Sequence, residues 1–133
     1  MEISEDYVSF EIAKLIKEKG FHSECHAYYT SYANGHNEFH ISEAYPLCLD
    51  FNNDGEDYET SVPTLQMTMK WLREVHKIFI TISVRFSNNA DDDINFSYLI
   101  KDHNEHTEYD DGEFISYEDA CEAAIEYSLT RLI

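Results

Sequence analysis

The sequence predicts an α+β fold: an antiparallel sheet of about four to five strands, built from two hairpins, with three helices in the order helix, hairpin, helix, hairpin, helix. Three stretches carry apolar residues at three- and four-residue steps, a pattern typical of amphipathic helices. Residues 78–86 and 94–100 alternate apolar and polar residues, which is typical of half-buried strands, and residues 24–32 are rich in the aromatic, β-branched or small residues that suit a strand. From Ser61 to Phe86 the helical pattern runs directly into a strand pattern, so this stretch is central to the predicted fold.

The first helix is predicted from Ser4 to Lys19, and Gly20 supplies the left-handed stop that glycine favours. Acidic residues lie toward its amino end and lysines toward its carboxyl end, as the helix dipole favours. A hairpin follows, with strands from Glu24 to Tyr32 and from Glu38 to Ser42 around a turn at residues 33–35.

Proline limits the next segment, residues 45–51, to an edge strand or an irregular path, because Pro46 cannot donate a ladder hydrogen bond. Residues 52–60 are polar and are predicted to form a loop. The central helix starts near Ser61, with Pro63 in its first turn, where a missing N–H is not needed. A strand at 78–86 follows directly.

A second hairpin is predicted to join this strand to residues 94–100 across a turn at 87–93. Residues 102–112 are polar, with room for a short strand at their centre. Ser116 and Asp119 form a capping-box arrangement at the start of a last helix, which runs to the chain end.

The composition of the 133-residue chain fits one globular domain over residues 1–133, because 43% of the residues are hydrophobic and 14% aromatic. No apolar run is long enough to span a membrane, and the amino terminus lacks the features of a secretory signal, so the expected location is cytoplasmic. Cys25, Cys48 and Cys121 are an odd number without short paired spacings, and we expect reduced, buried thiols.

The formal net charge of −18 is the most informative property of the composition. No Lys or Arg occurs between Gly20 and Met69. Such a surface repels phosphate groups, which argues against direct binding to nucleic acid or to an anionic membrane and favours a basic protein as partner. Acidic surfaces also keep small proteins soluble, and solubility alone is an alternative explanation.

Residues 50–55, Asp-Phe-Asn-Asn-Asp-Gly, match the opening of a calcium loop, in which oxygens at alternate positions converge on the ion. The twelfth position of such a loop brings a bidentate Glu but is Ser61 here, so another carboxylate, from Asp57 or Glu59, has to replace it. An ordinary polar turn uses the same residue types and is the alternative. The candidate calcium ligands are Asp50, Asn52, Asp54 and Glu59.

The spacing H-x2-C-x10-H-x3-H defines a second candidate metal site, for zinc, which accepts thiolate and imidazole ligands. A domain with its own hydrophobic core does not need such a metal to fold, and dispersed surface histidines are the alternative explanation. The set consists of His22, Cys25, His36 and His40, with His26 as an alternate.

Catalytic motifs are absent from the sequence: there is no glycine-rich phosphate loop, no G-x-S-x-G and no H-E-x-x-H. Cys25 and His26 are neighbours in a predicted strand, so their side chains point to opposite faces and do not meet. An enzyme is therefore not indicated, and no catalytic residue is predicted.

Three strings carry a resemblance: YVSFEIAKLIKEKGF at residues 7–21, VPTLQMTMKWLREVH at 62–76 and YEDACEAAIEYSLTRLI at 117–133. They resemble a family of short, uncharacterised proteins of gut Bacteroides genomes and of their phages and prophages, and W-L-R-E-V-H is the most specific part. The resemblance implies a mobile-element context, in which small accessory proteins often bind host proteins. It implies no particular activity and no catalytic residues.

Two hypotheses of function follow. The first is a non-enzymatic binding or regulatory protein of phage or prophage origin that contacts a basic host or phage protein, with imitation of nucleic acid as one form of that contact. The second is a calcium-binding domain that uses residues 50–59. Within W-L-R-E-V-H, Trp71 and Arg73 are the candidate protein-contact residues, on the condition that both are exposed together.

Overall fold

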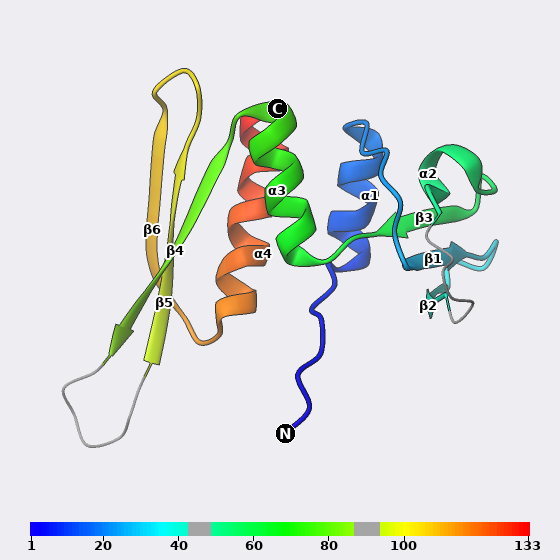
Figure 1. Ribbon diagram of the computed structural model, residues 1–133, viewed down its shortest axis with the longest axis horizontal. Coiled ribbons are helices and arrows are strands. Elements are labelled where there is room, and N and C mark those ends of the chain that lie inside the picture. The colour runs from blue at the N-terminus through cyan, green and yellow to red at the C-terminus, as the bar shows by residue number, and fades with distance from the viewer. Residues whose placement is uncertain (43–48, 87–93) are drawn as a thin grey trace. The chain divides into compact units, whose positions relative to one another are not determined.

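The computed structural model describes residues 1–42, 49–86 and 94–133, and the chain divides into two compact units, Met1–Thr64 and Leu65–Ile133 (Figure 1). Each unit contains helices and a three-stranded antiparallel sheet. The predicted α+β class with antiparallel strands is therefore confirmed. The detail differs, because the two hairpins belong to separate sheets and each gains a third strand. One domain over residues 1–133 stays a prediction.

In the first unit, α1 (Phe10–Glu18) begins later than predicted. Ser9 is its N-cap, and the Ser9 Oγ accepts a hydrogen bond from the Ile12 N–H at 3.3 Å. Tyr7 pairs instead with the chain near residue 64 in an isolated antiparallel bridge, which keeps it out of the helix. Gly20 has a φ of 88° and follows the helix end, as the sequence predicts.

The predicted first hairpin is present as β1 (Ala27–Ser31) and β2 (Asn37–Ile41), and β3 (Glu59–Val62) pairs with the other side of β1. The structure therefore corrects two boundaries: residues 59–60 belong to a strand and not to a loop, and residues 61–64 precede the central helix, which begins at Leu65. Pro63 is thus not in the first turn of that helix, contrary to the prediction. The physical reason is the free edge of β1, which β3 fills with buried residues. A short helix, α2 (Phe51–Asp54), lies between β2 and β3 in sequence. Most of the segment 45–51 lies outside the described residues.

In the second unit, α3 (Leu65–His76) leads directly to β4 (Phe79–Phe86), as predicted. Lys77 has a φ of 57° and makes the turn between them. β5 (Ile94–Lys101) pairs with β4 in the predicted hairpin, whose turn at 87–93 lies outside the described residues. β6 (Thr107–Phe114) is longer than the short strand expected and completes the order β4-β5-β6.

The last helix is α4 (Tyr117–Tyr127), continued by one turn of π-helix, η1 (Ser128–Leu132). Ser116 caps α4 as predicted, because its Oγ accepts a hydrogen bond from the Asp119 N–H at 3.0 Å. Within this unit, α3 and α4 lie on the same side of the sheet, and α4 packs on β5 (Figure 1).

Two expectations from composition can be compared with the described residues. No helix that they form combines the length and the hydrophobicity that crossing a bilayer requires. Cys25 and Cys121 are buried, as expected for small hydrophobic side chains, and Cys48 lies outside the described residues.

Candidate functional site

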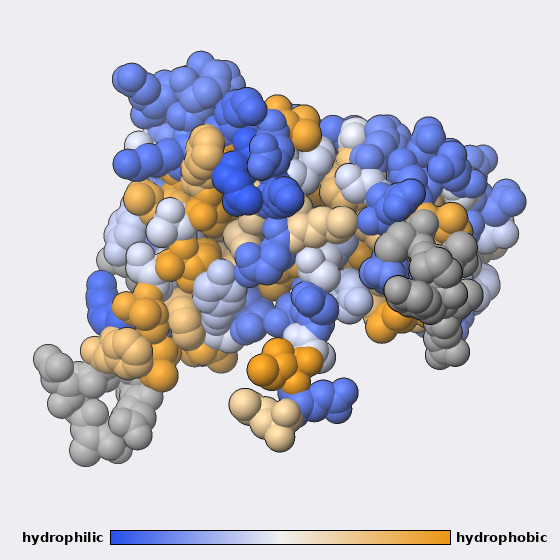
Figure 2. Space-filling view, viewed as in Figure 1, coloured by the Kyte–Doolittle hydropathy of each residue, from blue (hydrophilic) through white to orange (hydrophobic). Residues whose placement is uncertain are grey.

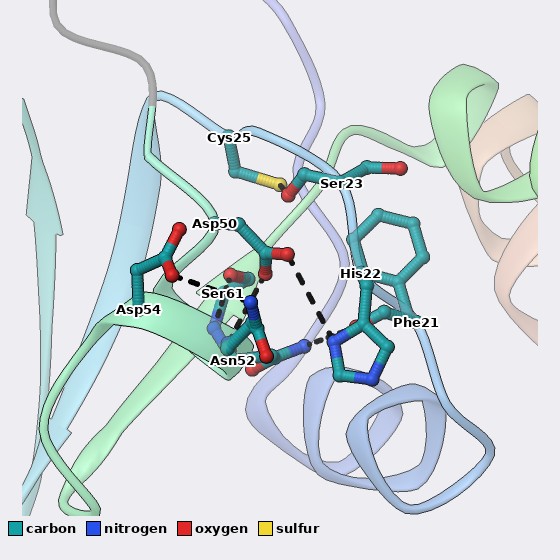
Figure 3. A network of polar contacts seen from close by, with 9 residues as sticks. Phe21, His22, Ser23, Cys25, Asp50, Asn52, Asp54 and Ser61 are labelled. Carbon is teal, nitrogen blue, oxygen red and sulfur yellow. Dashed lines mark hydrogen bonds and ion pairs between the residues drawn. The ribbon is translucent and has the colours of Figure 1, made fainter.

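The proposed calcium loop begins as a capped helical turn. Asp50 is the N-cap of α2, and its Oδ1 accepts a hydrogen bond from the Asn53 N–H at 3.2 Å (Figure 3). The other oxygen, Oδ2, lies 3.9 Å from Nδ1 of His22, an ion pair that forms only when the histidine is protonated. Both Asp50 oxygens thus have local partners within the protein.

Asn52 joins two segments that are distant in sequence. Its Nδ2 donates to the Phe21 carbonyl at 3.0 Å, and its Oδ1 accepts from the Ser61 N–H at 2.9 Å. The Asn52 N–H donates to the Ser61 Oγ at 3.2 Å (Figure 3). Because the amide nitrogen and the amide oxygen of Asn52 both form hydrogen bonds with backbone groups, the side chain holds α2 against β3 and against the chain after α1. This role is structural and leaves no reason to assign the amide oxygen to a metal.

The two remaining candidate calcium ligands also bond locally. Asp54 Oδ1 accepts from the Asn53 Nδ2 at 3.2 Å, and Glu59 Oε1 accepts from the Glu56 N–H at 2.9 Å. Among the described residues, no three His, Cys, Asp or Glu side chains are grouped so that they can hold a metal ion. The structure therefore does not bring Asp50, Asp54 and Glu59 together as a calcium ligand set.

The candidate zinc ligands are dispersed over the first unit. Cys25 Sγ donates to the Ser23 carbonyl at 3.6 Å (Figure 3). His36 stacks on Tyr32 with ring centroids 5.9 Å apart, and His40 stacks on Tyr28 at 5.0 Å. His22 faces Asp50, and no metal group joins these residues within the described part of the chain.

Trp71 and Arg73 do not form a common exposed surface. The Trp71 side chain is buried, with 9% of the residue exposed, and its ring meets the His76 ring edge-to-face at a centroid distance of 4.7 Å. Arg73 is exposed. The condition for a contact surface at W-L-R-E-V-H is thus not met, because the helical period turns Trp71 toward the core and Arg73 to solvent.

A hollow that no sequence motif indicates lies at α2. It has a volume of about 150 Å³, and we call it the acidic hollow. Phe51, buried and stacked on Tyr28 with ring centroids 4.4 Å apart, contributes an apolar wall. The lining residues are Leu49, Phe51, Asp54, Gly55, Glu56 and Glu59. The acidic residues were visible in the sequence, but their position around an apolar wall depends on the fold.

The size and lining of the acidic hollow limit what it can bind. Pockets for drug-sized ligands have volumes of about 300–1,000 Å³, so this hollow suits a single side chain. Lysine and arginine combine an aliphatic stem with a cationic head, and they bury the stem on apolar surface while the head stays in a polar environment. The lining, with apolar residues and three carboxylates, matches that chemistry.

Cations close to the acidic residues bind backbone groups. Lys17 Nζ donates to the Glu59 carbonyl at 2.8 Å, and Lys77 Nζ donates to the Glu74 carbonyl at 2.8 Å. Arg131 lies over the Tyr127 ring, 5.8 Å from its centroid. These three cations are already counted in the net charge of −18, which attracts an external cation whatever their local contacts are.

A second hollow, of about 220 Å³, lies in the second unit beside Tyr98 and Tyr127. Burial, followed by the charges of Asp110 and Glu108, raises the pKa of Tyr98 from 10.0 to about 12. The pKa of Tyr127 is also raised, by burial and by its hydrogen bond to Glu108 at 3.2 Å. Both phenols are therefore protonated near neutral pH, and neither is suited to act as a base there.

Comparisons of the chain with protein-family models, with curated proteins and with solved structures found no match.

Proposed function

We propose that this protein is a cytoplasmic, non-enzymatic binding protein of phage or prophage origin whose acidic surface contacts a basic host or phage protein. The observation that carries the proposal is the acidic hollow, where Asp54, Glu56 and Glu59 surround an apolar wall on a chain with a net charge of −18. This lining fits a lysine or arginine side chain of the partner. The phage origin rests on the resemblance of the three helical strings alone.

The expected energetics are those of many weak contacts. An exposed ion pair contributes roughly 0.2–1 kcal/mol, so one carboxylate cannot hold a partner by itself. A surface of one sign raises the association rate and selects partners of opposite charge. Imitation of nucleic acid is one form of this contact, and it predicts that a DNA-binding partner cannot hold DNA and this protein at once.

A labelled peptide of serine and lysine tests the charge contact by fluorescence anisotropy. The double variant Asp54→Asn, Glu56→Gln removes two carboxylates that line the acidic hollow and retains the Asp54 side-chain acceptor as an amide oxygen. At roughly 0.5 kcal/mol per exposed ion pair, we expect about a fivefold loss of affinity.

The matched control is Glu2→Gln, Glu5→Gln, which removes two exposed carboxylates from the amino-terminal segment. Both double variants change the net charge from −18 to −16, since each removes two negative charges. The control is expected to lose less than about twofold. Equal losses in both variants would exclude the acidic hollow as the site, and no binding of the peptide to the unaltered protein would contradict the proposed function itself.

A further inference from the structure

The sheet of the second unit has an apolar face that its helices cover only in part. The cross-strand pairs on this face are Ile80–Ile100, Ile82–Tyr98, Val84–Phe96 and Phe86–Ile94. At one end Ile100 and Tyr98 are buried beneath α4. At the other end Val84 is 48% exposed and Phe86 is 69% exposed. The alternation of a core strand thus continues beyond the helix that covers it.

The uncovered surface extends to the start of α4. The Tyr117 ring meets Phe96 edge-to-face at a centroid distance of 6.2 Å, and Ile115 is 82% exposed. Figure 2 shows orange, apolar side chains gathered at this end of the sheet. We call this surface the apolar patch; it consists of Val84, Phe86, Ile94 and Tyr117.

Exposed apolar side chains that gather at one place on a protein are characteristic of binding surfaces. Burying one large apolar side chain contributes about 1.5–3 kcal/mol, whereas a single exposed ion pair contributes only about 0.2–1 kcal/mol. The apolar patch is therefore able to add affinity and specificity that the acidic charges alone do not supply.

The charges around the apolar patch indicate whether a second copy of this chain or a basic partner covers it. Glu118 and Asp119 lie in the first turn of α4, next to Tyr117 in the apolar patch. Arg85 alternates with Val84 and Phe86 and so points to the opposite face, where it lines a small hollow with Glu113. A second copy of this chain would bring another net charge of −18, which opposes self-association. A partner with lysine or arginine beside its apolar residues has the complementary charge.

The space suits one helix. The pairs Val84–Phe96 and Phe86–Ile94 are two residues apart, about 7 Å along the strands. Packed helices lie about 8–10 Å apart, so one further helix beside the start of α4 extends the existing helix layer over the uncovered end.

We propose that the apolar patch is the docking surface for an amphipathic, basic helix of a protein partner. Apolar side chains of that helix cover Val84 and Phe86, and its lysines or arginines face Glu118 and Asp119. This inference rests on the proposed function, because it names the kind of segment that the basic partner presents.

The test uses three labelled peptides of about 18 residues, or five helical turns. One is an amphipathic helix of leucine and lysine, the second replaces each leucine by serine, and the third replaces each lysine by glutamate. The unaltered protein is expected to bind the leucine–lysine peptide about tenfold more tightly than the serine–lysine peptide. Phe86→Ser is expected to remove most of this difference, and so is Tyr117→Ser, a second variant that lies outside the sheet.

Phe79→Ser is the matched control. Phe79 lies on the same strand, is 48% exposed and points to the opposite face, so its loss is expected to leave the affinity difference unchanged. Circular dichroism of each variant verifies that it is folded.

Each result that differs from these expectations overturns a particular part of the proposal. Equal binding of the leucine–lysine and serine–lysine peptides overturns the docking surface and leaves the charge contact standing. Equal binding of the leucine–lysine and leucine–glutamate peptides overturns the basic partner. Failure of both lysine peptides overturns the docking surface and the proposed function together. A dimer in light scattering that Phe86→Ser dissociates assigns the apolar patch to a second copy and overturns the proposal.

Discussion

Asn52→Ala is expected to destabilise the first unit strongly. The substitution removes the bond from Asn52 Nδ2 to the Phe21 carbonyl and the bond from the Ser61 N–H to Asn52 Oδ1. Phe21 and Ser61 are fully buried, so water cannot easily replace the lost partners. The cost is set less by the bonds themselves than by the two buried backbone groups that lose a partner.

The magnitude follows from these two groups. Leaving the buried Ser61 N–H without a bond costs about 1–3 kcal/mol, and losing the bond to the Phe21 carbonyl adds about 0.5–1.5 kcal/mol. Small domains are stable by about 5–15 kcal/mol in total, and such a loss is a large fraction of that. The Asn52 N–H, which donates to the Ser61 Oγ, is retained in the variant.

Hydrogen exchange measures the loss unit by unit, because protection of the α1 and β3 amides reports the first unit directly. Asn53→Ala is the matched control: Asn53 is exposed, and its side chain donates to Asp54 Oδ1 at the surface. We expect this control to change stability by no more than about 0.5 kcal/mol. A loss in Asn52→Ala that is no larger than in Asn53→Ala would refute the role assigned to the Asn52 amide.

Two further predictions concern the second unit. Ser116→Ala removes the acceptor for the Asp119 N–H and is expected to cost about 1 kcal/mol in urea unfolding; an unchanged midpoint contradicts the cap. Because the pKa of Tyr98 is raised from 10.0 to about 12, the folded state holds this proton more tightly than the unfolded state. Its contribution to stability is complete below about pH 10 and is lost as pH rises to about 12. Tyr98→Phe should abolish a tyrosinate absorbance step near pH 12, and persistence of that step would show that another phenol titrates there.

Features with a local cause could be predicted from the sequence. Gly20 ends α1 and Ser116 begins α4, because each depends on residues within one helical turn. The direct passage from α3 to β4 is likewise predicted by the sequence, because the spacing of the apolar residues changes there from a period of 3.6 to a period of two.

Features with a distant cause could not be predicted. Residues 59–62 form β3 because β1 offers a second edge and Asn52 bonds the Ser61 backbone, and neither fact is local. The Asp-x-Asn-x-Asp pattern is shared by calcium loops and capped turns, and the bonds of Asp50 and Asn52 show which one formed. The alternation in β4 indicates an apolar face but not how far α4 covers it.

The salt dependence of binding to the leucine–lysine peptide tests the acidic contact most directly. Raising the ionic strength from about 0.01 M to about 0.1 M shortens the Debye length from about 30 Å to about 10 Å. If the charge of −18 draws and orients a basic partner, the affinity falls several-fold over this range while the gain from leucine over serine remains. An affinity that stays constant as salt rises would contradict the proposed contact with a basic protein.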